Sequence, residues 1–236
     1  MIKFKKAFFV IIFLFCVCRT QTVVGQKINR FNKNHERTGI WKKYYPNKRI
    51  RYLGQFKKGK EIGVFKFYDA SSSEVPVIIK TYYNNSDAVF AQFFTVEGTI
   101  KTEGFLEDKN RVGVWKYFNR NGKIMSTENY ENGVLHGDQF VYYPNGQTTA
   151  VSKYKNGRLE GVSSKYSSKG ILIEEITYAH DIPNGEAKYY ELNGNLKETG
   201  SYKDGKRIGT WYFYLDGKLA PEQNKNKRTN QGFKNN

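Results

Sequence analysis

The chain has 236 residues, a formal net charge of +17 and an aromatic content of 16%. Tyr (18) and Phe (17) supply most of the apolar surface, which favours β-strands because aromatic side chains pack well on pleated surfaces. Both cysteines, Cys16 and Cys18, lie within the first 25 residues. A mature chain that begins after them has no disulfide and no thiolate chemistry.

The first 25 residues differ from the rest of the chain. Three lysines within the first six residues precede an uninterrupted apolar run over residues 7–18. That run is short for a membrane span and fits the apolar region of a secretory signal, so we expect cleavage before Gln26. The protein is then exported to the periplasm, cell envelope or exterior of a bacterium. Retention of residues 1–25 as an anchor remains an alternative, whereas the bulky residues before both cysteines argue against a lipoprotein.

A 24-residue repeat occupies most of the remaining sequence. Seven units open on a glycine, and one degenerate unit opens on Val89. Successive openings are 24 residues apart except for one interval of 26, and the two-residue insertion lies near residues 70–76. The opening glycines are Gly39, Gly63, Gly113, Gly137, Gly161, Gly185 and Gly209.

One unit illustrates the pattern. Trp115 and Tyr117 are two residues apart, which places both rings on one face of a strand. An Asn-Gly pair ending at Gly122 predicts a tight hairpin turn, Tyr130 lies on the return strand, and Gly133 marks a second turn. A lone hairpin of this size is marginal in water, so neighbouring units are needed to bury the rings.

The sequence therefore predicts an all-β fold, an elongated single-sheet antiparallel β-meander of about eight hairpin units. Residues 26–38 form an N-terminal lead-in and residues 39–219 form the repeat domain. Residues 220–236 are basic, contain almost no apolar side chain and are predicted to be a disordered tail.

The quoted pattern resembles a known family. The Gly-x-Trp openings, "YYPNG" at residues 142–146 and "YKDGKRIGTW" at residues 202–211 are similar to MORN repeats, in particular to a bacterial variant with a period near 24. That variant occurs in secreted proteins and in proteins labelled antitoxin components. The resemblance covers about residues 39–219. It implies a meandering antiparallel sheet used for contact with proteins or lipids, not for catalysis.

The residues themselves offer no catalytic set, so we expect no enzymatic activity, no cofactor and no metal site. His35, His136 and His180 fall at unrelated positions of the repeat, and no metal-ligand motif is present. Glu174 and Glu175 are adjacent on a strand and face opposite sides, which argues against joint acid–base work.

Two groups of residues are candidates for a binding surface. The first is an aromatic position five residues after the opening of a unit, either half-buried in a ribbon that packs on both faces or exposed as a binding stripe. It comprises Tyr44, Tyr68, Phe118, Tyr142, Tyr166, Tyr190 and Tyr214. The second is a set of cations at turns, either a solvated edge that prevents strand pairing or a contact for an acidic partner. It comprises Lys57, Lys58, Lys203, Lys206 and Arg207.

These features favour a non-catalytic repeat scaffold that mediates protein–protein interaction in the cell envelope or outside the cell, with an antitoxin-like role as one form of that function. The partner protein is unknown. The alternative is binding of membrane phospholipid or an acidic polysaccharide through basic turns and exposed tyrosines. Because the chain is predicted to leave the cytoplasm, no nucleic-acid partner is expected.

Overall fold

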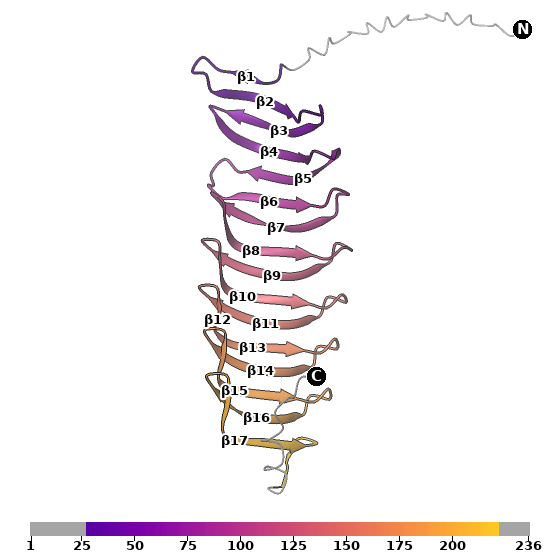
Figure 1. Cartoon of the computed structure of the whole chain (residues 1–236), viewed down its shortest axis with the longest axis vertical. Helices are drawn as coiled ribbons and strands as arrows, with labels where there is room; N and C mark the ends of the chain where they lie inside the picture. Colours follow the sequence, from indigo (N-terminus) through magenta and orange to yellow (C-terminus); the bar gives the residue numbers. More distant parts are fainter. Residues whose placement is uncertain (1–26, 222–236) are drawn as a thin grey trace, which may run out of the picture.

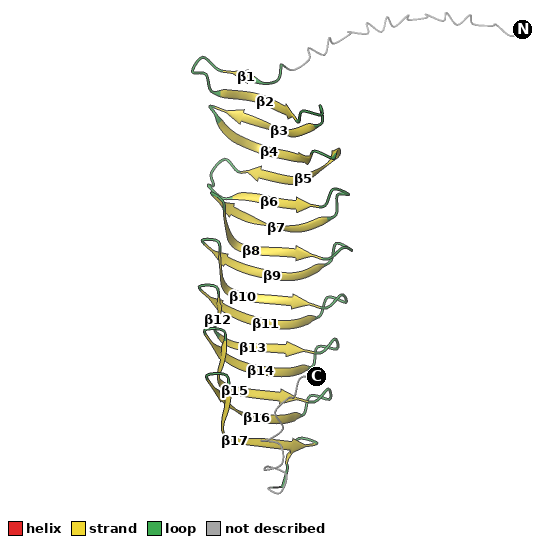
Figure 2. Ribbon diagram, viewed as in Figure 1, coloured by secondary structure: helices red, strands yellow, loops and turns green. Residues whose placement is uncertain are grey.

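The computed structural model describes residues 27–221. Within that range the chain is all-β, with no helix, and forms one open antiparallel sheet of 18 strands in meander order (Figures 1 and 2). Each strand pairs with its neighbours along the chain, so the strands stack as a tall ladder with turns along both long edges (Figure 1). The predicted fold class is confirmed.

The eight predicted units supply sixteen of the strands, and β1 and β12 are the two additional short ones. The strands of the N-terminal half are β1 (Arg30–Phe31), β2 (Arg37–Tyr44), β3 (Ile50–Lys57), β4 (Lys60–Asp69), β5 (Ser72–Tyr82), β6 (Val89–Phe94), β7 (Ile100–Glu107), β8 (Asn110–Phe118) and β9 (Ile124–Glu131). The strands of the C-terminal half are β10 (Val134–Tyr142), β11 (Thr148–Lys155), β12 (Arg158–Leu159), β13 (Gly161–Tyr166), β14 (Leu172–Ala179), β15 (Ile182–Tyr190), β16 (Leu196–Lys203), β17 (Lys206–Leu215) and β18 (Lys218–Leu219).

Most turns between two units are two-residue turns whose central residues both have positive φ. Asn132 (φ 51°) and Gly133 (φ 82°) form one such turn, as expected for an Asn-Gly hairpin. The Gly133 N–H also donates to the Arg111 carbonyl at 2.9 Å, and Gly157 donates in the same way to Leu135 at 2.8 Å. Successive turns are thus bonded to one another, which links the units along this edge.

Five opening glycines lie inside a strand, at a register shift of the ladder: Gly63, Gly113, Gly137, Gly185 and Gly209. The register of β9 and β10 shifts between Leu135 and Gln139, around Gly137, which has a φ of 94°. An extra residue in one strand of a pair is a β-bulge, and glycine is suited to it because it adopts positive φ without strain. In these five units the glycine therefore changes the direction of the opening strand.

The rings of the hydrophobic core lie on one face of the sheet, here called the front face and defined by Trp41, Trp115 and Trp211. Their exposed fractions are 3%, 1% and 8%, and Phe65 at the same repeat position is 1% exposed. The predicted inward orientation of this position is confirmed. Within residues 27–221 no second layer covers the front face, so the rings must be buried by their own neighbours in the sheet.

Glycine on the preceding strand provides the space for these rings. A Cβ built on Gly104 would lie 2.5 Å from the ring of Trp115, and Gly54 and Gly200 hold the same relation to Phe65 and Trp211. The indole therefore lies flat against the neighbouring backbone. Aromatic neighbours meet it at the edges, as in the T-shaped contact of Tyr202 with Trp211 at 5.2 Å.

The size of the residue at this repeat position follows the residue that faces it. Where Ile176 occupies the preceding strand, the position holds Ala187, which is 0% exposed. Where Glu128 is the facing residue on the preceding strand, the same repeat position holds Gln139. Large rings occur opposite glycine and small or polar residues occur opposite side chains. This pairing keeps a one-layer core closely packed.

The degenerate third unit departs from the regular geometry. Val89 replaces an opening glycine, and the ladder between β5 and β6 runs without a register shift. The two-residue insertion is absorbed in the β4–β5 hairpin, where the register shifts on both sides of Tyr68. The meander continues through this unit, so the irregularity leaves the architecture intact.

Both ends of the ladder finish in two-residue strands, β1 and β18, which limits the length of unpaired edge. The predicted lead-in therefore contributes a strand, because β1 pairs with β2. Ala220 is 8% exposed and donates to the Phe213 carbonyl, so ordered packing extends to this residue of the predicted tail. The predicted export signal, and residues 222–236 of the tail, lie outside the described residues.

Residues 27–221 contain no helix long and apolar enough to cross a membrane.

The glycine–ring pairing generates a stability prediction. Gly104→Ala should lower the free energy of unfolding by roughly 1–3 kcal/mol, because the new methyl group overpacks the Trp115 ring. Ser152→Ala, at the same repeat position opposite Ser163, should cost less than about 1.5 kcal/mol. Urea unfolding of both variants measures the difference, and equal losses would contradict the pairing.

Candidate binding surfaces

Polar side chains on the front face form hydrogen-bonded networks. Within residues 27–221 no group of three or more His, Cys, Asp or Glu side chains is placed to hold a metal ion. Ser126 and Ser163 are buried, and the Ser163 hydroxyl lies 3.0 Å from that of Ser152. A serine pair without a base offers no activated nucleophile.

The central network covers Trp115. The Arg111 guanidinium lies 4.9 Å from the centre of the Trp115 ring, and its Nη1 donates to the hydroxyls of Tyr117 (2.9 Å) and Tyr130 (3.1 Å). Tyr130 in turn donates to Glu128 at 2.6 Å. The cation is thus held by ring faces and hydroxyls together, in a cation–π arrangement that seals the indole from solvent.

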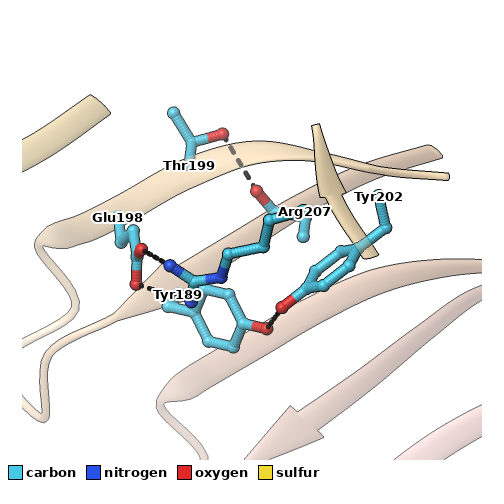
Figure 3. A network of polar contacts seen from close by, with 6 residues as sticks. Tyr189, Glu198, Thr199, Tyr202 and Arg207 are labelled. Atoms are coloured by element: carbon cyan, nitrogen blue, oxygen red, sulfur yellow. Dashed lines mark hydrogen bonds and ion pairs between the residues drawn. The ribbon is translucent and has the colours of Figure 1, made fainter. Parts of the chain in front are cut away.

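A second network repeats this plan at the C-terminal end (Figure 3). The Arg207 guanidinium lies 4.0 Å from the centre of the Trp211 ring and pairs with both carboxylate oxygens of Glu198. The hydroxyls of Tyr189 and Tyr202 lie 3.1 Å apart beneath it (Figure 3). Bidentate pairing fixes the guanidinium plane over the indole.

The tyrosines of the front face resist ionisation. Burial raises the pKa of Tyr117, and its hydrogen bond with Tyr130 and the nearby charge of Glu128 raise it further. Burial, followed by the hydrogen bond to Tyr202, likewise raises the pKa of Tyr189. These neutral hydroxyls therefore act as structural hydrogen-bonding groups at physiological pH.

The aromatic stripe lies on the opposite side of the sheet, here called the back face. Tyr44 is 50% exposed, and the six other members are half-buried. The Lys42 ammonium lies 5.3 Å from the centre of the Tyr44 ring, and Tyr142 stacks on Phe140 at 6.5 Å. Each ring is thus held by its neighbours while part of it stays accessible to a partner.

Two members of the stripe line open hollows between successive turns. Phe118 lines a hollow of about 590 Å³ together with Tyr117 and Met125. Tyr166 lines one of about 390 Å³ with Gln147 and Val151. These hollows are wide and shallow, so they fit protruding side chains of a protein better than an enclosed small molecule.

The cations predicted at turns fall into two separate groups. Lys57 and Lys58 lie near the N-terminal end of the ribbon, whereas Lys203 and Lys206 lie at the β16–β17 turn near the other end (Figure 1). All four are exposed. Arg207 forms an ion pair with Glu198 and covers the Trp211 ring, so its guanidinium stabilises the packing of the front face. The structure does not bring the two groups together.

Sequence reasoning missed the arginines that cover the tryptophans. Each tryptophan stands in an Arg-x-Gly-x-Trp pattern, and this spacing was the available signal. The arginines are Arg37, Arg111 and Arg207, each within 5.0 Å of the ring centre of its tryptophan. The bulge at the central glycine brings residue four positions earlier over the ring on the same face.

Sequence reasoning also missed the role of the second tyrosine and the asparagine in the "YYPN" turns. Tyr143 donates to the Tyr166 carbonyl at 2.9 Å, and Tyr45 donates to the Tyr68 carbonyl at 2.9 Å. Asn145 donates similarly to the Ser168 carbonyl at 3.0 Å. The side chains of one turn thus bind the backbone of the next unit.

The geometry defines an open β-repeat scaffold whose units depend on one another for burial. Four segments match the family model described as the MORN repeat variant, at residues 37–58, 111–132, 135–156 and 183–204. The chain belongs to the MORN-repeat proteins. MORN repeats are generally non-catalytic scaffolds. No curated protein matches the chain.

The raised tyrosine pKa values predict loss of stability in alkali. The folded pKa of Tyr117 lies above its ordinary value of 10.0, so this contribution is complete below pH 10 and is lost as pH rises toward the folded pKa. Tyr117→Phe removes the ionisable group, so its free energy of unfolding should fall less steeply above pH 10. Urea unfolding between pH 8 and about 11.5 measures both slopes; identical slopes would exclude this linkage.

Proposed function

We propose that this protein is a non-catalytic scaffold that binds another protein along the ribbon, in the cell envelope or outside the cell. The scaffold class follows from the MORN repeats. Export is supported by the lysines and the apolar run within residues 1–25. The partner is unknown, and the proposal specifies the surface of this chain that contacts it.

The observation that carries this proposal is the repeated, partly accessible ring of the back face. The front-face tryptophans are sealed by arginines, whereas every ring of the stripe but the exposed Tyr44 is half-buried. Half-buried aromatic side chains are enriched in protein interfaces because they offer large apolar area at low entropic cost. A partner that follows the ribbon meets one such ring in almost every unit.

An antitoxin-like role is one form of this function, in which the scaffold holds a bound protein inactive. It is supported by the resemblance of the 24-residue repeat to that of proteins labelled antitoxin components. An inhibitor of this kind requires only a stable contact surface, and the bonded turns of the ladder supply a stiff one.

A second candidate function is contact with an anionic membrane surface or acidic polysaccharide. The exposed turn cations Lys57 and Lys58 favour it, because neighbouring lysines attract phospholipid head groups. Tyr44, with half of its surface exposed, belongs to the same hairpin but lies at its opposite end, beside Ile50. This candidate predicts binding that weakens steeply with salt.

Affinity capture from the native cell envelope tests the main proposal. The double variant Tyr142→Ser/Tyr166→Ser should lose capture of the partner, while the melting temperature should fall by only a few degrees because both rings are already half exposed. Capture is followed by mass spectrometry, and melting by circular dichroism.

The matched control is Tyr154→Ser/Tyr178→Ser, which changes two tyrosines of the same units on the front face. It should retain capture. A large fall in melting temperature for the stripe variant would show that the stripe is mainly structural. Failure of the wild-type chain to capture any protein would contradict the scaffold proposal.

Sedimentation with vesicles tests the second candidate. If the turn cations bind membrane, vesicles containing about 30% phosphatidylserine should pellet the wild-type chain at low salt and release it near 0.5 M salt. Lys57→Glu/Lys58→Glu should abolish pelleting. Equal pelleting with neutral phosphatidylcholine vesicles would contradict an electrostatic contact.

A further inference from the structure

The positive charge of the repeat region is concentrated at one end. Residues 27–66 contain thirteen Lys and Arg against two Asp and Glu, a net charge of +11. Residues 67–221 contain eighteen against nineteen, a net charge of −1. The repeat pattern does not require this asymmetry, because the same positions in the later units fold with balanced charges. Strands β1 to β4 are therefore a basic end of the ribbon.

Five cations of this end lie on the back face by strand alternation. In β3, Tyr52 and Phe56 pack on the front, so Arg51 and Lys57, at the adjacent positions, face the back. The same alternation, counted from Trp41 in β2 and from Phe65 in β4, places the cations of these two strands on the back face. The five are Lys42, Arg51, Lys57, Lys60 and Lys66, and none has an ion-pair partner among residues 27–221.

An apolar patch adjoins these cations on the back face. Val64, Phe105 and Val114 are 49%, 40% and 56% exposed, and Phe90 contacts Phe105 at 5.2 Å between ring centres. Strand pairing places them side by side across β4 to β8, since Thr81 joins Val64 to Phe90 in the ladder. In the C-terminal half the equivalent row is largely polar, with Asn129, Asp138, Lys153, Thr177 and Glu186.

A contiguous exposed apolar row beside unpaired cations has the composition of a protein interface. An acidic amphipathic segment matches it: its apolar side chains would cover the valines and Phe105, and its carboxylates would meet Lys42 and Lys66. A second copy of this chain fits poorly, because two basic ends would approach each other. A membrane surface would use the charge but would not select an apolar row across the middle of the sheet.

We infer that the back face of β2 to β8 is a docking surface for an acidic, amphipathic polypeptide segment. This inference rests on the proposed scaffold function. It specifies which part of the ribbon binds one segment of the partner and what chemistry that segment carries, while the aromatic stripe contacts the partner farther along the back face. The patch defined by Val64, Phe90, Phe105 and Val114 supplies the apolar contact. The five back-face cations supply the charge.

The repeat itself provides matched controls. Val162 occupies the same repeat position as Val64 and Val114 and is 52% exposed, but Glu175, Thr177 and Lys188 surround the hollow it lines. Lys188 likewise occupies the repeat position of Lys42 and Lys66, outside the basic end. The same chemical change can thus be made inside and outside the surface.

The probe is a fluorescein-labelled twelve-residue peptide of alternating Leu and Glu, measured by anisotropy with the full chain. We expect binding to weaken at least tenfold in Val64→Glu/Val114→Glu and in Lys42→Glu/Lys66→Glu. Binding should change less than twofold in Val162→Glu and Lys188→Glu. A Leu–Lys peptide and a Ser–Glu peptide should each bind at least tenfold more weakly than the probe.

Failure of the probe to bind wild type, or equal binding by all variants, would overturn this inference. A dimer in sedimentation that Val64→Glu/Val114→Glu disperses would also overturn it, as would vesicle binding lost in that variant. Unchanged circular dichroism shows that the variants remain folded, which their exposed positions favour.

Envelope capture separates this inference from the proposed function. A partner captured by wild type and by Val162→Glu but not by Val64→Glu/Val114→Glu supports both. A partner still captured by the patch variant leaves the scaffold function standing and rejects this surface.

Discussion

The structure depends on the contact between an aromatic ring and the glycine of the preceding strand. Within residues 27–221 the sheet has one layer, so a ring that stood upright would remain in water. The Trp115 ring instead lies on Gly104, and Arg111 covers its other side. The large apolar area of the indole is thereby removed from water without a second layer. Where the facing residue is not glycine, the ring is replaced by a smaller or polar side chain.

This manner of burial separates the two faces by role. Arginine, indole and tyrosine hydroxyls satisfy one another on the front, as in the network of Arg207, Glu198 and Trp211. The back face lacks such covers in the units that carry Val64, Val114 and Val162, which remain about half exposed. Repetition provides stability through the front face and bonded turns, and this leaves the back face free to vary from unit to unit. Differences in charge and apolarity along that face are therefore the basis on which partner specificity is proposed.

Much of the fold could be predicted because local signals recur. Asn-Gly pairs such as Asn132 and Gly133 fix tight turns, and period-two aromatics such as Trp115 and Tyr117 fix one inward face. The candidate surface was less accessible to prediction. The stripe was recognised by its position, but its degree of burial depends on neighbours such as Phe140 beside Tyr142. The uneven charge was present in the sequence, yet its meaning required knowing which cations share a face with Val64.

Turn chemistry and side-chain alternation act over a few residues, so the strand content, the meander and the number of units could be predicted from the amino-acid pattern. Which residue faces which across strands depends on the register of the assembled sheet. The bulge at Gly113 shifts the register, so Gly104 meets Trp115 and Arg111 reaches over the same ring. A one-residue change in register would send these side chains to the opposite face. The pairing of ring, glycine and arginine is thus a property of the assembled ladder, where contacts between strands fix positions that no single unit specifies.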